Sequence, residues 1–234
     1  MRRVVLISLL CLLTLPMLGK VYVVSVGIAD YPGRENDLRV SSEDARTIST
    51  IFLTAKNSSV RVLTNREATK SALLGAMHSM FSVADKDDTV ILYFSGHGME
   101  GSLVCYDGPL SYKYITNQMK ACKAKQRIVI VDACYSGKMR NNGHATRSHD
   151  SPNVMFFLSS RTNELSRESK FKNSLFTIFL ERGLRGGADN NRDRRITARE
   201  LYDFVHSGVV NASNGHQHPV MWGNFDNNMT VIKW

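Results

Sequence analysis

Apolar runs and amphipathic segments alternate along the chain, and this alternation restricts the fold more than any other feature of the sequence. Nearly continuous apolar runs are typical of strands buried on both faces, whereas apolar residues at helical spacing are typical of surface helices. The runs predict strands at residues 21–28, 60–63, 89–94, 127–131, 154–158, 219–222 and 229–232. The spacing predicts helices at residues 42–52, 69–84, 111–122, 174–184 and 198–209, with a hairpin at 101–106. We therefore expect an α/β fold, in which helices cover both faces of a mostly parallel central sheet.

The N-terminus has the pattern of a secretory signal peptide. Two arginines after Met1 precede an apolar run at residues 4–15, and Pro16 and Gly19 follow it. We expect residues 1–19 to be removed and residues 20–234 to form one domain. No later stretch approaches about 20 apolar residues, so no membrane span is expected after signal removal. The expected location is the periplasm, the cell envelope or the medium.

Charge and cysteine content restrict the function further. The formal net charge is +9, but the basic residues are scattered without a Lys/Arg cluster, which argues against nucleic acid as a partner. No glycine-rich phosphate loop follows a predicted strand, so no organic cofactor is expected. Cys105, Cys122 and Cys134 follow the signal peptide. Their odd number leaves at least one free thiol, and a bond between Cys105 and Cys122 stays open.

A histidine and a cysteine each follow the end of a predicted buried strand. His97 comes between two glycines after the run at residues 89–94, and Cys134 follows the run at residues 127–131. The carboxyl ends of parallel strands meet at one edge of a sheet, where ligands bind. A thiolate attacks carbonyl carbon and an imidazole can take the thiol proton, so the pair predicts a cysteine peptidase. The N–H groups of Gly98 and Cys134 would form its oxyanion hole. Either side chain alone would more often be structural.

Several segments resemble known motifs. Tyr93-Phe-Ser-Gly-His97-Gly98 and Asp132-Ala-Cys134-Tyr-Ser-Gly137 resemble the histidine and cysteine motifs of caspase-like peptidases, most closely those of the bacterial and metacaspase branch. The resemblance continues, in family order, at Val26-Gly-Ile-Ala-Asp30-Tyr-Pro, Ser42-Glu-Asp44-Ala, Leu158-Ser-Ser-Arg161 and Ser174-Leu-Phe-Thr177. It implies a caspase-like three-layer α/β/α sandwich. It also implies that Cys134 is the nucleophile and His97 the general acid and base of a dyad.

The same resemblance implies a substrate preference. In the family branch that cuts after Arg or Lys, the residue two before the nucleophile contributes to an acidic pocket, and here that residue is Asp132. By resemblance, Asp44 and Ser95 would complete the pocket, because a buried carboxylate favours a cationic side chain by charge pairing. A solvent-facing carboxylate on the surface of a helix is the alternative interpretation of Asp44.

The segment at residues 138–152 is a long polar loop that contains Lys138, Arg140 and Arg147. Exposed loops are preferred sites of proteolysis, so we expect the enzyme to cut itself there or to be cut by a relative. A merely solvated loop is the alternative.

A second motif matches the spacing of an EF-hand calcium loop. Its oxygen ligands would come from Asp189, Asn191, Asp193, the backbone of Arg195, and Glu200. Arg194 replaces the usual turn glycine, and neighbouring arginines oppose cation binding. The motif indicates a degenerate calcium site, and Ca²⁺ is the metal that the sequence suggests.

Together, these features predict an exported cysteine endopeptidase that acts on proteins or peptides with Arg or Lys before the cut. Two alternatives remain. One is a catalytically silent caspase-like scaffold that binds peptides or protein partners, and the other is a calcium-binding interaction module around Glu200.

Overall fold

The computed structural model of the chain describes residues 19–55, 57–133, 154–160 and 172–234. Nearly all of the predicted signal peptide lies outside these residues, as do Cys134 and the whole loop at residues 138–152. Among the described residues, no helix is both long and apolar enough to span a bilayer.

The centre of the fold is a six-stranded sheet with the strand order β10-β8-β7-β3-β1-β2. Neighbouring strands are parallel, except that β10 runs antiparallel to β8. The predicted mostly parallel sheet is therefore confirmed. The strands are β1 (Val21–Gly27), β2 (Ser58–Thr64), β3 (Thr89–Ser95), β7 (Gln126–Asp132), β8 (Val154–Leu158) and β10 (Val220–Asn224).

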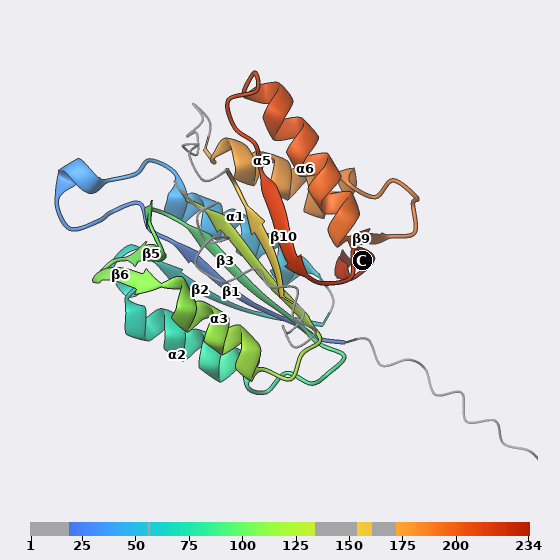
Figure 1. The fold of residues 1–234 in the computed structure, drawn as a ribbon, viewed down its shortest axis with the longest axis horizontal. Helices are drawn as coiled ribbons and strands as arrows, with labels where there is room; N and C mark the ends of the chain where they lie inside the picture. Colours follow the sequence, from blue (N-terminus) through green and yellow to red (C-terminus); the bar gives the residue numbers. More distant parts are fainter. Residues whose placement is uncertain (1–18, 56, 134–153, 161–171) are drawn as a thin grey trace, which may run out of the picture.

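Helices cover both faces of this sheet, which confirms the three-layer prediction (Figure 1). On one face lie α2 (Lys70–Phe81) and α3 (Tyr112–Ala121); on the other lie α1 (Ser41–Thr54), α5 (Leu175–Arg182) and α6 (Ala198–Ala212). Side chains alternate across the pleat of β3, so one core receives Val90, Leu92 and Phe94, and the other receives Ile91 and Tyr93. Both faces of the central strands are buried, and this is why their sequences are continuously apolar.

Smaller elements surround the sheet. An antiparallel meander of β4 (Gly98–Met99), β5 (Ser102–Cys105) and β6 (Gly108–Ser111) follows β3, where one hairpin was expected. The short strand β9 (Arg195–Thr197), which the sequence did not indicate, pairs with β11 (Thr230–Lys233). Short 3₁₀ turns lie at Arg34–Asn36 and Asn65–Glu67, and a π-turn at Gly183–Gly187 extends α5.

Cys105 and Cys122 are both buried and both free, so the open question of their pairing is answered: they form no disulfide with each other. Cys122 Sγ contacts the carbonyl oxygen of Met119 at 3.4 Å. Burial, followed by the negative charge of Asp107, raises the pKa of the Cys105 thiol to about 12. Both residues therefore act as small apolar core side chains.

Candidate active site

The predicted catalytic segments follow the carboxyl ends of β3 and β7, which are neighbours at one edge of the sheet. Ser95 and Asp132 are direct partners in the parallel pairing of these strands. The N–H of Gly96 then donates to the carbonyl oxygen of Asp132 at 3.1 Å. His97 follows β3 by two residues, and Cys134 follows β7 by the same interval. Because Cys134 lies outside the described residues, the dyad and the oxyanion hole formed with Gly98 stay predictions.

The imidazole of His97 has a defined orientation. Its Nε2 lies 2.8 Å from the carbonyl oxygen of Asn36. A carbonyl can only accept a hydrogen bond, so Nε2 carries a proton, and Nδ1 is the nitrogen that has the free lone pair when the imidazole is neutral. The ring also packs on Tyr31, with centroids 4.8 Å apart and planes tilted by 46°. In this arrangement, Nδ1 is the nitrogen available as a base.

The backbone of His97 is held by a residue to which the sequence assigned no role. The N–H of His97 donates to the hydroxyl of Tyr31 at 2.9 Å, and that hydroxyl donates to the carbonyl oxygen of Val104 at 2.9 Å. Burial raises the pKa of Tyr31, so the hydroxyl keeps its proton. In the sequence, Tyr31 appears only as part of the family-like segment Val26–Pro32, and nothing else there indicated a role for it.

A cavity of about 630 Å³ opens beside His97. Its walls come from the loop after β1 and from the β4–β6 meander, and they include Tyr31, Asn36, Gly98, Tyr106 and Asp107. The cavity is large enough for substrate residues next to the imidazole.

A pair of buried carboxylates lies on the other face of the same sheet edge. Asp44 is 0% and Asp132 is 4% exposed. Ser95 Oγ donates to Asp44 Oδ2 at 2.9 Å. The interpretation of Asp44 as a helix-surface carboxylate is wrong, because the first turn of α1 packs against the sheet. The missing side chain of Gly27 permits this packing, since a Cβ there would collide with the carbonyl oxygen of Ser41.

The start of α5 provides further donors to the two carboxylates. Asn173 Nδ2 and the N–H of Ser174 donate to Asp44 Oδ1 at 2.9 and 3.0 Å. The hydroxyl of Ser174 donates to Asp132 Oδ2, and Thr177 Oγ1 lies 3.5 Å from the same oxygen. We name Asp44, Ser95, Asp132, Asn173 and Ser174 the acidic cluster. The sequence predicted the first three members; Asn173 had no signal, and Ser174 appeared only as the start of a motif.

The electrostatics of the acidic cluster favour a bound proton or another cation. Burial first, and then the negative charge of Asp132, raises the pKa of Asp44 to about 7, against the lowering effect of hydrogen bonds from Asn173, Ser174 and Ser95. All of these donors are neutral groups. Burial and the same two carboxylates also raise the pKa of Tyr93. A substrate cation placed between the carboxylates would offset their repulsion.

The predicted calcium loop forms its turn without glycine. Arg194 has a φ angle of 63°, in the left-handed region. The Asp189 carboxylate accepts the N–H groups of Asp193 and Arg194 at 3.2 and 3.1 Å, and Asn191 Oδ1 accepts the former at 3.0 Å. The side-chain oxygens at the first two ligand positions are thus engaged within the loop.

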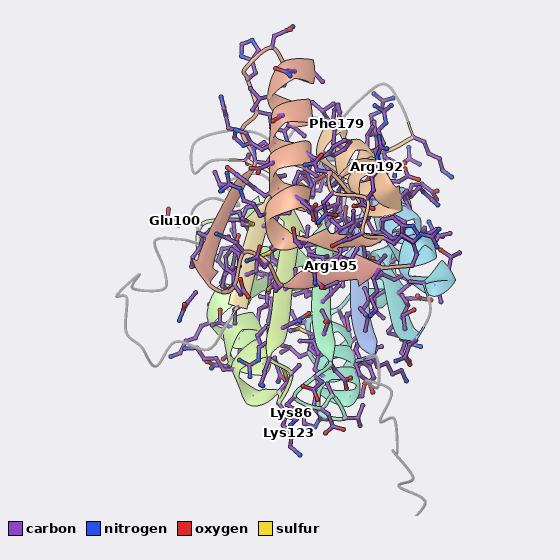
Figure 2. The ribbon with its side chains drawn as sticks, turned by 90° about the vertical axis from the view of Figure 1, so that its right-hand side faces the viewer. Lys86, Glu100, Lys123, Phe179, Arg192 and Arg195 are labelled. Atoms are coloured by element: carbon purple, nitrogen blue, oxygen red, sulfur yellow. The ribbon has the colours of Figure 1, made fainter. Side chains whose placement is uncertain are left out.

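The last ligand position is also engaged. Glu200 Oε2 accepts the N–H and hydroxyl of Thr197 at 3.0 and 2.7 Å, and the N–H of Glu200 donates to Thr197 Oγ1 at 3.3 Å, which completes the capping box of α6. Arg195 Nε lies 3.0 Å from Asp193 Oδ2, and Figure 2 shows Arg192 and Arg195 on the segment between α5 and α6. Among the described residues, no group of three or more His, Cys, Asp and Glu is placed to hold a metal. The side-chain oxygens of this loop are thus engaged within the protein and do not fit calcium.

Comparisons with known proteins agree with this architecture. A protein from Geobacter sulfurreducens has a similar structure, with a TM-score of 0.68 and 16% identity over 92% of this chain and 97% of that one. Caspase-1 from Spodoptera frugiperda aligns with a TM-score of 0.68 and 15% identity over 90% of this chain and 88% of that one. No curated protein sequence matches significantly. The model of the caspase domain, Peptidase C14, matches residues 20–229. The chain therefore belongs to the caspase-domain family of cysteine peptidases.

Proposed function

We propose that this member of the family is an exported endopeptidase that cleaves proteins or peptides after Arg or Lys, with Cys134 and His97 as its catalytic dyad. The observation that carries the proposal is the acidic cluster at the sheet edge that also bears His97. Asp44 and Asp132 are both buried, and the donors found on Asp44 are neutral. A guanidinium or ammonium group of a substrate would pair favourably with these buried carboxylates.

The reaction follows from the orientation of the imidazole. Once the Arg or Lys side chain is bound, His97 Nδ1 takes the Cys134 thiol proton. The thiolate then attacks the carbonyl carbon of that Arg or Lys residue. The N–H groups of Gly98 and Cys134 stabilise the oxyanion. The imidazolium returns the proton to the leaving amine as the peptide bond breaks, which leaves a thioester on Cys134. Water, deprotonated by His97, then hydrolyses the thioester and regenerates the thiol.

The test is the hydrolysis of fluorogenic peptides that differ only in the residue before the cut. Wild type should cleave after Arg and Lys, and Cys134→Ala should cleave nothing. Asp132→Asn should lose about 100-fold or more in kcat/KM for Arg, because the substrate cation loses a buried partner. Asp203→Asn is the matched control, since Asp203 lies on α6 in an exposed ion pair with Arg199. Cleavage after Asp would refute the acidic pocket, and no cleavage by folded wild type would favour the silent scaffold.

Self-processing is the second part of the proposal. The three basic residues of the 138–152 loop match the preference proposed for the acidic cluster, so Lys138, Arg140 and Arg147 are the candidate cleavage sites. Purified wild type should convert to two fragments on a gel, with an N-terminus after one of these residues, while Cys134→Ala stays intact. Wild type that remains as intact as Cys134→Ala would refute self-processing.

A further inference from the structure

The hydrogen bonds between His97 and β5 depart from a regular antiparallel ladder. β4 and β5 pair Gly98 with Leu103, which makes His97 and Val104 the next opposed pair. The N–H of Val104 donates to the carbonyl oxygen of His97 at 3.0 Å, as expected for a hydrogen-bonded pair. In such a pair, the return bond runs from the N–H of His97 to the carbonyl oxygen of Val104.

The hydroxyl of Tyr31 occupies the place of that return bond. It accepts the N–H of His97 at 2.9 Å and donates to the carbonyl oxygen of Val104 at 2.9 Å. One oxygen atom is therefore inserted into the ladder, and it separates the backbone of His97 from β5 while both backbone groups keep a partner. This separation of the two strands lies at His97, whose imidazole lines the cavity.

The surroundings of Tyr31 keep its hydroxyl at this position. Its side chain is only 6% exposed, and its own N–H donates to Asp37 Oδ1 at 3.1 Å. A Cβ atom at Gly96 would lie 2.6 Å from the hydroxyl oxygen, too close for a real contact. Glycine at position 96 therefore makes the space into which the hydroxyl fits.

We infer that the Tyr31 hydroxyl is a positioning group for His97: it holds the backbone of His97 away from β5 and thereby directs the imidazole. With the hydroxyl in place, His97 Nε2 meets the carbonyl oxygen of Asn36 at 2.8 Å, and Nδ1 is left for the thiol. Without it, the N–H of His97 can bond directly to Val104, and the histidine moves toward β5. Displacements of about 1 Å at a reacting group can slow turnover by about 100-fold. The inference rests on the proposed dyad but not on the proposed Arg or Lys preference.

The test is Tyr31→Phe, which keeps the ring and removes only the hydroxyl. Against an Arg peptide, we expect kcat to fall by about 100-fold with KM within about twofold, because positioning affects the chemical step. The control is Tyr114→Phe on α3, where the side chain is 59% exposed, and its kcat should equal that of wild type. Melting temperatures of both variants separate positioning from loss of folding.

A second measurement needs no substrate. Iodoacetamide alkylates only the thiolate form of Cys134, and peptide mass spectrometry measures the rate from about pH 5 to about pH 10. The pH at the midpoint of this profile reports how strongly the imidazole favours the thiolate. In Tyr31→Phe, the midpoint of this profile should shift toward the ordinary thiol value of about 8.5. This assay does not depend on which peptides the enzyme cleaves. It therefore still tests the inference if the enzyme does not prefer Arg or Lys.

Gly96→Ala provides an independent perturbation, because its methyl group would displace the hydroxyl while Tyr31 remains. It should reproduce the alkylation shift, and it replaces Tyr31→Phe if that variant does not fold. A folded Tyr31→Phe or Gly96→Ala protein with the alkylation profile of wild type would overturn the inference. So would a kcat for Tyr31→Phe equal to that of Tyr114→Phe on a peptide that wild type cleaves.

Discussion

Replacing Asp44 with asparagine should stabilise the free protein at high pH and leave its stability at low pH unchanged. Asparagine can keep the contacts of the carboxyl group: its oxygen can accept from Asn173 and Ser174, and its amide can donate to Ser95, whose hydroxyl can rotate. The substitution therefore removes the titration of Asp44 while the hydrogen-bonding geometry is retained. It probes the cost of ionising Asp44, to which burial contributes first and the charge of Asp132 second.

The size of the effect follows from the pKa of Asp44, which burial and the charge of Asp132 raise from 3.8 to about 7. Between these values, the folded protein holds a proton that the unfolded chain has released. The raised pKa thus contributes stability below the unfolded value, and this contribution is lost as the pH rises through the folded value. At 1.36 kcal/mol per pH unit, the free energy of unfolding loses about 4 kcal/mol from this group. Asparagine does not titrate, so the variant keeps that stability.

Urea unfolding at about pH 4 and about pH 8, in a Cys134→Ala background that prevents self-digestion, measures this difference. At about pH 8, the midpoint for Asp44→Asn should exceed that of the parent by about 2 M, for a slope of about 2 kcal/mol per M. At about pH 4, the two midpoints should coincide, because Asp44 is then protonated. Asp203→Asn provides the matched control, since its carboxylate is half exposed on α6. If Asp44→Asn and its parent differed in midpoint by the same amount at both pH values, the assignment of the buried proton to Asp44 would be refuted.

Three further results are expected. Thr197→Ala should lower the free energy of unfolding by about 1 kcal/mol, because α6 loses its capping box; an unchanged thermal melt would contradict this role. Calcium at millimolar concentration should leave the melting temperatures of wild type and Asp189→Ala unchanged, because the loop oxygens are engaged internally, and a calcium shift abolished by Asp189→Ala would contradict this. Cys105 should react with iodoacetamide only after unfolding, since it is buried with a raised pKa; rapid labelling of the native protein would contradict its burial.

The central sheet could be predicted from the sequence because its signal is local. The strands β1, β3, β7 and β8 are short, mostly apolar runs, because burial on both faces requires such runs; the edge strand β2 is mostly half-buried and carries a weaker signal. The strand β9 carried no such signal. It has only three residues, begins with a half-exposed Arg195, and is formed by pairing with β11, more than 30 residues later. Pairing over such a separation leaves no local periodicity.

The sequence predicted the polar side chains of the site but not the groups that hold them in place. Asp44, Ser95 and Asp132 were named from motifs, and the structure brings them together. Asn173 was missed because its contact with Asp44 spans 129 residues of sequence, and only the docking of α5 beside α1 creates it. The contact of His97 with Asn36 uses a backbone carbonyl, which any residue supplies, so no residue type could have indicated it. Backbone partners of this kind become visible only in three dimensions.

The acidic cluster and His97 together favour a peptidase over a silent scaffold. Two buried carboxylates on the same network, with neutral donors on Asp44, lower the stability of the free protein at neutral pH, and a structural role would be served better by apolar side chains. A scaffold that binds basic peptides would explain the cluster, but it would not need an oriented imidazole. His97 has its backbone held by Tyr31 and its Nε2 held by Asn36, so Nδ1 is the nitrogen left to exchange a proton. In the proposed mechanism, the acidic cluster binds the basic side chain of the substrate, and His97 exchanges the proton.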